Sequence, residues 1–122
     1  MNNTVFEING KSYELDIADV ETMERYDAAF EAMKKRGEAI TDLDSPVAIM
    51  RAYCENFVKL YDDLFGEGAG KEILGDKLNT TKCDETYAEF LDFVRTQKEE
   101  SINRRASIIA YTPNRRQRRA KR

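Results

Sequence analysis

The stretch "SPVAIMRAYCENFVKLYDDLF", residues 45–65, decides the fold because it carries the widest apolar face in the chain. Ser45 can cap a helix and Pro46 suits the first helical position, so a helix is predicted to begin here. Its apolar side chains recur at spacings of three and four residues. They are Met50, Tyr53, Cys54, Phe57, Leu60, Tyr61, Leu64 and Phe65. We therefore expect this segment to be the central core helix.

The stretch "GEGAGKE", residues 66–72, follows this helix and resembles a phosphate-binding loop. A Walker motif has four residues between its first glycine and its Gly-Lys pair, whereas Gly66 and Gly70 enclose three. Glu72 also stands where the motif has a Ser or Thr that binds Mg²⁺. We interpret these glycines as a flexible hinge, followed by a short helical turn, "KEIL", before Gly75.

A second helix is predicted upstream, beginning after Asp16 or Asp19, because either aspartate can cap it. Its apolar stripe consists of Val20, Met23, Tyr26, Phe30 and Met33. The "KKRG" stretch, residues 34–37, is typical of a helix end. An extension to Ile40 stays open at this point.

A third long helix is predicted from about Thr80–Asp84 to about Arg105. Its stripe consists of Tyr87, Phe90, Leu91 and Val94, with Phe93 at the edge and Ile102 as a further candidate. Residues 95–100 are all polar, which indicates that the helix projects beyond the core.

The N-terminal stretch "TVFEINGKSYELDI", residues 4–17, predicts a β-hairpin. Asn9-Gly10 is the preferred central pair of a type I′ turn, because both positions need positive φ. This turn pairs Ile8 with Lys11 and Phe6 with Tyr13, and it places the apolar side chains on one face. A lone two-stranded hairpin is marginal in water, so we expect it to pack on the helices.

Acidic and basic residues are distributed unevenly along the chain. Residues 1–102 hold all 23 acids and 12 bases, a net charge of −11, whereas the last twenty residues hold eight bases and no acid. We predict an acidic domain over residues 1–107 and a basic flexible tail over residues 108–122. The predicted fold class is mainly α, with three to four helices in a small bundle, an N-terminal β-hairpin packed on it, and a disordered basic C-terminal tail.

The chain has no histidine and two cysteines. Zinc sites of the usual Cys/His type and triads that use histidine are therefore excluded. We predict no catalytic residue, metal or cofactor, and no enzymatic activity. Cys54 is expected to pack in the core, and Cys83, near a helix start, is the candidate for a lowered pKa. No signal peptide or apolar run of membrane-spanning length is recognised, which predicts a reduced cytosolic protein and no membrane partner.

Several apolar residues exceed what a core of this size needs. Val47, Ile49 and Phe65, together with Ile108, Ile109 and Tyr111, are predicted to form a surface for another chain. A partner, a second copy in a homo-oligomer, and plain core packing all remain open at this point.

The order of motifs resembles that of small tail assembly chaperone-like proteins of long-tailed phages and prophages of Gram-positive bacteria. The similar segments are "FEINGKSYELD", "RAYCENFVKLYDDLFGEGAGKEILG" and the terminal "PNRRQRRAKR", and together they span nearly the whole chain. The most specific of them are "FGEGAGKEILG" and "NRRQRR". In the terminal motif the matching residues are Asn114, Arg115, Arg116, Arg118 and Arg119.

The resemblance implies a function without catalysis. Such proteins bind the long, aggregation-prone tape measure protein and keep it soluble during tail morphogenesis. It further implies the tail tube protein as a second partner, action in the bacterial host cytoplasm, absence from the mature virion, and a partner-binding role for the terminal motif. The alternatives are a nucleic-acid-binding regulator that uses the Arg-rich tail and a minor structural tail protein. The acidic body counts against nucleic acid, because its field repels phosphate.

Overall fold

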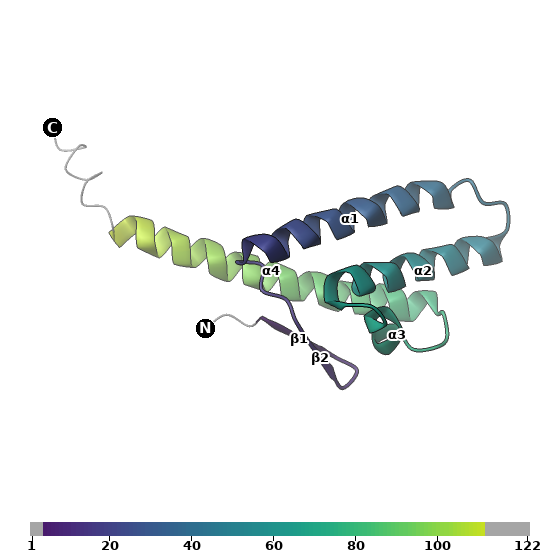
Figure 1. Cartoon of the computed structure of the whole chain (residues 1–122), viewed down its shortest axis with the longest axis horizontal. Coiled ribbons are helices and arrows are strands. Elements are labelled where there is room, and N and C mark those ends of the chain that lie inside the picture. The colour runs from purple at the N-terminus through teal and green to yellow at the C-terminus, as the bar shows by residue number, and fades with distance from the viewer. Residues whose placement is uncertain (1–3, 112–122) are drawn as a thin grey trace.

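The computed structural model describes residues 4–111 of the chain. Within this part the elements run β1 (Val5–Ile8), β2 (Lys11–Glu14), α1 (Val20–Ile40), α2 (Pro46–Phe65), α3 (Ala69–Leu74) and α4 (Thr80–Tyr111). Figure 1 shows α1 and α2 as an antiparallel helical hairpin, with α4 alongside and the β-hairpin and α3 on the same side as α4. The described part is thus mainly helical with an N-terminal β-hairpin, as predicted.

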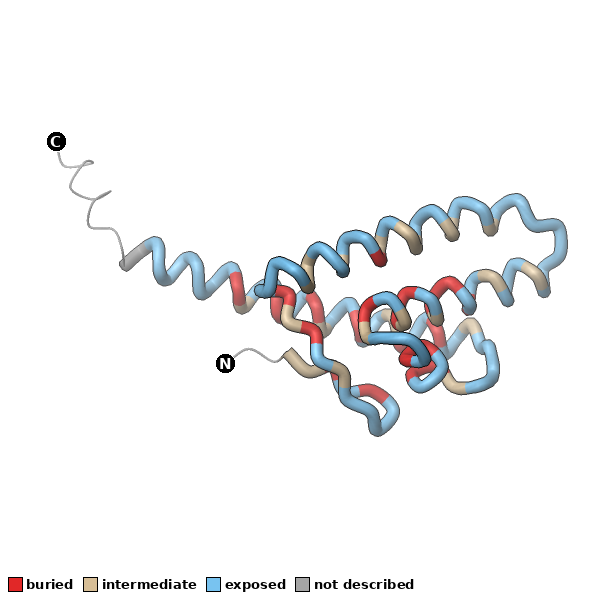
Figure 2. Tube along the Cα trace, viewed as in Figure 1, coloured by how far each residue is buried: buried red, intermediate tan, exposed pale blue. Residues whose placement is uncertain are grey.

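Helix α2 is the centre of the fold, as its apolar face predicted. Ser45 caps it with its hydroxyl oxygen, which accepts a hydrogen bond from the Ala48 N–H at 3.3 Å. The helix packs against α1, α3 and α4. The buried side chains of its core face are Cys54, Phe57, Leu60, Tyr61 and Leu64. Figure 2 shows burial concentrated in the second half of α2 and in the facing part of α4.

Helix α1 begins after Asp19, whose carboxylate accepts from the Thr22 N–H at 3.0 Å. The helix continues through Gly37 to Ile40, so the extension left open by the sequence is the observed one. Met23, Tyr26, Phe30 and Met33 are partly buried against the core. Val20 is solvent-exposed, which makes its predicted place in the apolar stripe wrong.

The β-hairpin has the predicted turn and register. Asn9 and Gly10 have φ values of 51° and 76°, as a type I′ turn requires. Phe6 pairs with Tyr13 and Ile8 pairs with Lys11. Phe6 is buried and lies 5.5 Å from Phe90 and 5.3 Å from Phe93 between ring centroids, so the hairpin packs on α4.

The short helical turn predicted before Gly75 is confirmed, whereas the interpretation of the preceding glycine-rich stretch as a flexible hinge is wrong, because Ala69 and Gly70 are buried within that helix. Residues 69–74 form α3, in which Ile73 and Leu74 are buried. A Cβ atom on Gly70 would lie 2.3 Å from the Val58 carbonyl oxygen, so only glycine permits this approach of α3 to α2. The Gly70 N–H donates to the Asp62 carboxylate at 2.7 Å, which fixes the junction.

Helix α4 is longer than predicted, and its buried face contains most but not all of the predicted stripe: Phe90 and Val94 are buried, and Tyr87 and Phe93 are partly buried. It extends to Tyr111, six residues beyond the expected end at Arg105, so the predicted domain boundary at 107/108 lies within the helix. Leu91 and Ile102 are exposed rather than buried, because the inward positions follow Phe90, Val94 and Gln97. The predicted projection is present: Figure 1 shows the last turns of α4 extending beyond the body.

Candidate interaction surfaces

The first surface is an apolar tip at the turn between α1 and α2, made of Leu43, Val47, Ile49 and Met50. Val47 is 65% exposed and Met50 is 52% exposed. Met50 precedes the buried Cys54 and Phe57 at spacings of four and seven, so it continues the core face of α2 toward the helix start. The covered part of this face begins near Tyr53, whose hydroxyl donates to the Asp84 carboxylate at the start of α4. The face of α2 that is buried further along the helix is therefore exposed at the tip, where α2 extends beyond the start of α4 (Figure 2).

A groove of about 230 Å³ lies beside the tip, between α1 and α2. Ile40, Leu43 and Ala52 supply apolar lining, and the polar and charged lining comes from Arg36, Glu55, Asn56 and Lys59. The Asn56 amide bridges the two helices, because it donates to the Met33 carbonyl at 3.0 Å and accepts from Arg36 Nε at 2.7 Å. Arg36 Nη2 is shielded from solvent and has no hydrogen-bond acceptor among the described residues. The groove thus combines apolar walls with a guanidinium group.

The two groups of apolar residues predicted to form one surface lie apart. Val47 and Ile49 lie in the first turn of α2, whereas Ile108 and Ile109 lie in the last turns of α4. Figure 1 shows these helix ends at opposite ends of the molecule. Phe65 belongs to neither group: it is partly buried, 5.0 Å from Tyr13 and 6.0 Å from Phe90 between ring centroids. The single predicted surface is therefore wrong.

The projecting end of α4 forms a second candidate surface. Ile102, Ile108 and Ile109 are more than half exposed, and Arg104 and Arg105 lie among them, so this end is both apolar and basic. Tyr111 is the last residue of α4, and its side chain lies outside the described part of the chain. The remaining predicted partner residues also lie outside it: Asn114, Arg115, Arg116, Arg118 and Arg119.

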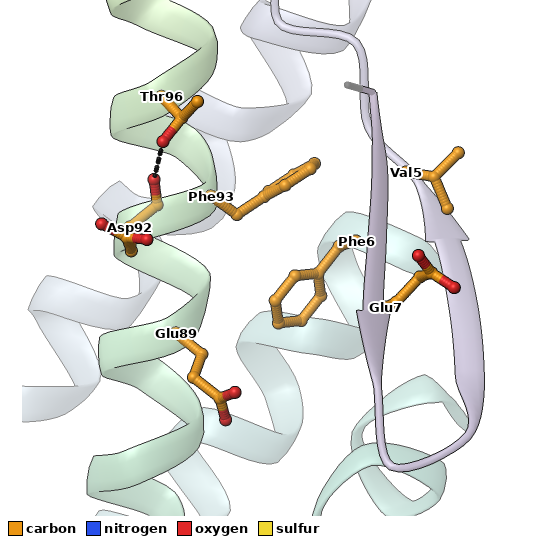
Figure 3. Close-up of a pocket in the computed structure, with 7 residues that line it drawn as sticks. All are labelled: Val5, Phe6, Glu7, Glu89, Asp92, Phe93 and Thr96. Atoms are coloured by element: carbon orange, nitrogen blue, oxygen red, sulfur yellow. Dashed lines mark hydrogen bonds between the residues drawn. The ribbon is translucent and has the colours of Figure 1, made fainter. Parts of the chain in front are cut away.

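A second hollow, of about 310 Å³, lies between β1 and α4 (Figure 3). The Phe6 and Phe93 rings lie between the two elements, with their centroids 5.3 Å apart. Glu89 extends into the same space from α4. The residues that line the hollow include the acids Glu7, Glu89 and Asp92 and no base. Asp92 forms an ion pair with the neighbouring Arg95.

Two buried amides were missed by the sequence reasoning. Gln97 Nε2 donates to the Leu15 carbonyl at 2.7 Å, and its Oε1 accepts from the Ile17 N–H at 3.1 Å. The side chain therefore pairs with the backbone just beyond β2 and joins it to α4. Asn56 plays the corresponding role between α1 and α2. Gln97 lies three residues after the buried Val94, and Asn56 lies four residues before the buried Leu60. This helical spacing was the signal in the sequence that could have indicated their burial.

The expectation of a lowered Cys83 pKa is wrong. Both cysteines are buried, and burial raises the pKa of the Cys83 thiol to about 12, with contact to the Cys54 thiol as the second cause. Desolvation disfavours the thiolate and outweighs the position of Cys83 near the start of α4. Cys54 packs in the core, as predicted.

Two further kinds of feature are absent from residues 4–111. No three His, Cys, Asp or Glu side chains within this range are arranged so that they could hold a metal ion. Among the helices of the described chain, none is both long and apolar enough to span a bilayer.

Comparison with known proteins identifies a family for nearly the whole chain. Residues 9–122 match the profile of a family of unknown function, DUF6673. No curated protein and no solved structure matches the chain. The matched range begins at the hairpin turn and covers every helix described above. The chain therefore belongs to the family DUF6673.

Proposed function

We propose that this protein is a phage tail assembly chaperone that binds the tape measure protein and keeps it soluble during tail morphogenesis. The observation that carries the proposal is the apolar tip, where the core face of α2 continues into solvent. A tape measure protein is a long helical chain, and an amphipathic helix binds by laying its apolar stripe on such a face. The motif resemblance to small tail assembly chaperones supports the same function.

The groove beside the tip suits this class of partner. Its apolar walls can accept side chains from one stripe of a helix, and the Arg36 guanidinium can donate to a carboxylate at the edge of that stripe. The projecting end of α4 is the proposed second contact, with Ile108 and Ile109 on the helix and the terminal arginine motif after it. Two separated contacts on one chain would raise the overall affinity through effective concentration.

The proposal extends to the cellular setting. We place the activity in the bacterial host cytoplasm, with the tail tube protein as a second partner, homo-oligomers as a route to higher avidity, and no place in the mature virion. Mass spectrometry of purified particles tests the last point. Recovery of this protein in stoichiometric amount would instead support the minor structural role.

Co-expression with the tape measure protein tests the function. We expect the full-length chain to raise the soluble fraction of the tape measure protein and to co-purify with it. The double variant Val47→Ser with Met50→Ser should lose most of this effect while folding normally, because both side chains are exposed. Ile108→Ser with Ile109→Ser tests the second contact in the same assay.

The matched control changes exposed apolar residues elsewhere. Val20→Ser with Leu91→Ser removes comparable apolar surface from α1 and α4, away from the tip. This variant should retain full solubilising activity. The proposal fails if the unmodified chain changes neither solubility nor association, and the assignment to the tip fails if the control variant loses as much as the tip variant.

A further inference from the structure

Cys54 and Cys83 lie 29 residues apart in the sequence and meet in the core. Each side chain is 1% exposed, and the hydrogen bond from Tyr53 to Asp84 joins the sequence neighbours of the two cysteines. After burial, the nearby Cys54 thiol is the next cause of the raised pKa of the Cys83 thiol. Cys54 is in α2 and Cys83 is in the first turn of α4. The two thiols are therefore neighbours across a helix–helix interface rather than isolated residues.

Contacts next to the thiols hold the two helices together at this level. The Tyr53 hydroxyl donates to the Asp84 carboxylate. About one helical turn further along both helices, the Phe57 and Tyr87 ring centroids lie 5.0 Å apart. These pairs share nearly the same sequence offset as the two cysteines, so a bond between the sulfurs joins helices that are already in register.

We propose that Cys54 and Cys83 form a redox-sensitive pair, which an organic disulfide such as oxidised glutathione converts into a cross-link between α2 and α4. The thiolate of one cysteine attacks the reagent and releases one glutathione thiolate, giving a mixed disulfide. The second cysteine then displaces the remaining glutathione. Overall two protein thiols are oxidised, one S–S bond forms, and the reagent is reduced to two thiols that carry the two protons.

Burial sets the rate of this reaction. The attacking species is the thiolate, and burial raises the pKa of the Cys83 thiol to about 12, so the closed fold holds Cys83 in the unreactive thiol form. Both side chains are also buried away from any reagent in solution. Reaction therefore requires transient opening of the first turns of α4. The only side-chain cap described there is the Asn79 carboxamide, which accepts from the Lys82 N–H at 3.0 Å. Oxidation should be slow in buffer and faster when this end of the helix is loosened.

The cross-link has a consequence for the fold. It closes the chain from residue 54 to residue 83, which contains α3 and the loops on either side of it. Such closure restricts the unfolded chain and raises resistance to denaturant, provided that the folded geometry is not distorted. The bond would also anchor the start of α4 at the border of the apolar tip. The inference is independent of the proposed function.

Incubation of the full-length reduced protein with oxidised glutathione at mildly alkaline pH tests the proposal. Intact mass should fall by two hydrogen atoms, and peptide mapping without reductant should join the peptides that contain Cys54 and Cys83. We expect the reaction to accelerate in urea below the unfolding transition. The oxidised chain should unfold at a higher urea concentration than the reduced chain, and dithiothreitol should restore the original midpoint.

The single variants Cys54→Ser and Cys83→Ser are the controls, with Cys54→Ala and Cys83→Ala in case the hydroxyl is not tolerated in the core. Each folded variant should form glutathione adducts or linked dimers and no internal bond. The proposal is overturned if the unmodified chain yields only adducts. It is equally overturned if the internal bond forms only above the unfolding transition, or if the oxidised chain unfolds at a lower urea concentration than the reduced chain.

Discussion

Two helical glycines show how the surroundings of one residue decide its effect on stability. Gly70 packs against the Val58 backbone, so Gly70→Ala should lower the free energy of unfolding by about 2–3 kcal/mol through overpacking. At Gly37 the nearest atom to a new Cβ is Asn56 Nδ2 at 3.8 Å, an ordinary contact. Gly37→Ala should therefore stabilise the protein by roughly 0.5–1 kcal/mol through helix propensity. Urea unfolding of both variants measures the difference, and equal effects would contradict the packing of α3.

Gln97 is the second residue with a large expected effect. Gln97→Met keeps the volume but leaves the Ile17 N–H and the Leu15 carbonyl without their buried partner. We expect a loss of about 2–4 kcal/mol in urea unfolding, because unsatisfied buried backbone groups carry most of the cost. The neighbouring Thr96→Ala, at an exposed position, should change stability by less than about 0.5 kcal/mol. A change of similar size for both variants would argue against this role of Gln97.

Helical spacing from Val94 could place Gln97 on the buried face, but it could not identify the backbone groups that Gln97 bonds. A stripe predicted from the spacing of apolar residues alone includes Leu91 and Ile102, and both of these side chains are exposed. The buried face is instead completed by polar side chains, among them Thr86, Gln97 and Ser101. The burial of Gln97 depends on the backbone groups that it bonds, which lie 80 and 82 residues earlier in the chain.

At the scale of the element, α4 consists of a packed part and a projecting part. The packed part runs from Cys83 to Ser101, the last buried residue of the helix as far as its burial is described. Backbone amides in the packed part should exchange with solvent hydrogen much more slowly than those at residues 103–109, because the latter residues are all exposed and local opening at them disrupts no buried core. Hydrogen-exchange mass spectrometry on the purified chain measures this gradient. Uniform protection along α4 would mean that the projecting part is covered in solution.

Most helix starts were predictable from local chemistry, as were the ends of α2 and α3 at Gly66 and Gly75, whereas the ends of α1 and α4 were not. Asp19 and Ser45 cap the following helices with their own side chains, so a few neighbouring residues settle where α1 and α2 begin. The "KKRG" stretch has the composition of a helix end, yet α1 continues because Met33 and Asn56 hold its later turns against α2. The end of α1 depended here on its packing partner.

At the scale of the whole molecule, ionisation of phenol and thiol groups should limit stability in alkali. Contact with the Asp84 carboxylate, followed by desolvation, raises the pKa of Tyr53 to about 12. Desolvation, followed by Glu72, raises the pKa of Tyr13 to about 12. Because the pKa is higher in the folded state than in the unfolded state, the unfolded chain loses protons first as pH rises. This part of the stability is complete below about pH 9–10 and is lost as pH rises through 12.

The urea midpoint, measured across pH 7–12, checks this expectation. It should be nearly constant to about pH 9 and then fall. Tyr53→Phe removes one of the responsible groups, so its midpoint should fall less steeply over the same interval, even if the variant is less stable at neutral pH. Parallel curves for the two proteins would show that Tyr53 does not contribute to the alkaline transition.

The arrangement of the surfaces could not be predicted from composition. Val47, Ile49, Ile108 and Ile109 were correctly singled out as apolar residues in excess of the core, and all four are exposed. Their grouping into one surface was wrong, because α2 begins at one end of the molecule and α4 ends at the other. These four side chains are exposed because the core is small, whereas their positions relative to one another depend on the paths of α2 and α4.

The sequence by itself determined the features that depend on residues close together in the chain. The Asn9-Gly10 turn sets the hairpin register, and the apolar spacing of residues 50–65 makes α2 the core helix, because backbone preferences and helical periodicity act over a few residues. Only the tertiary structure decided the fit of Gly70 against Val58, the backbone partners of Gln97, the contact between the two thiols and the separation of the apolar surfaces. Each of these arises where segments distant in sequence meet, and local spacing carries no information about which surfaces those will be.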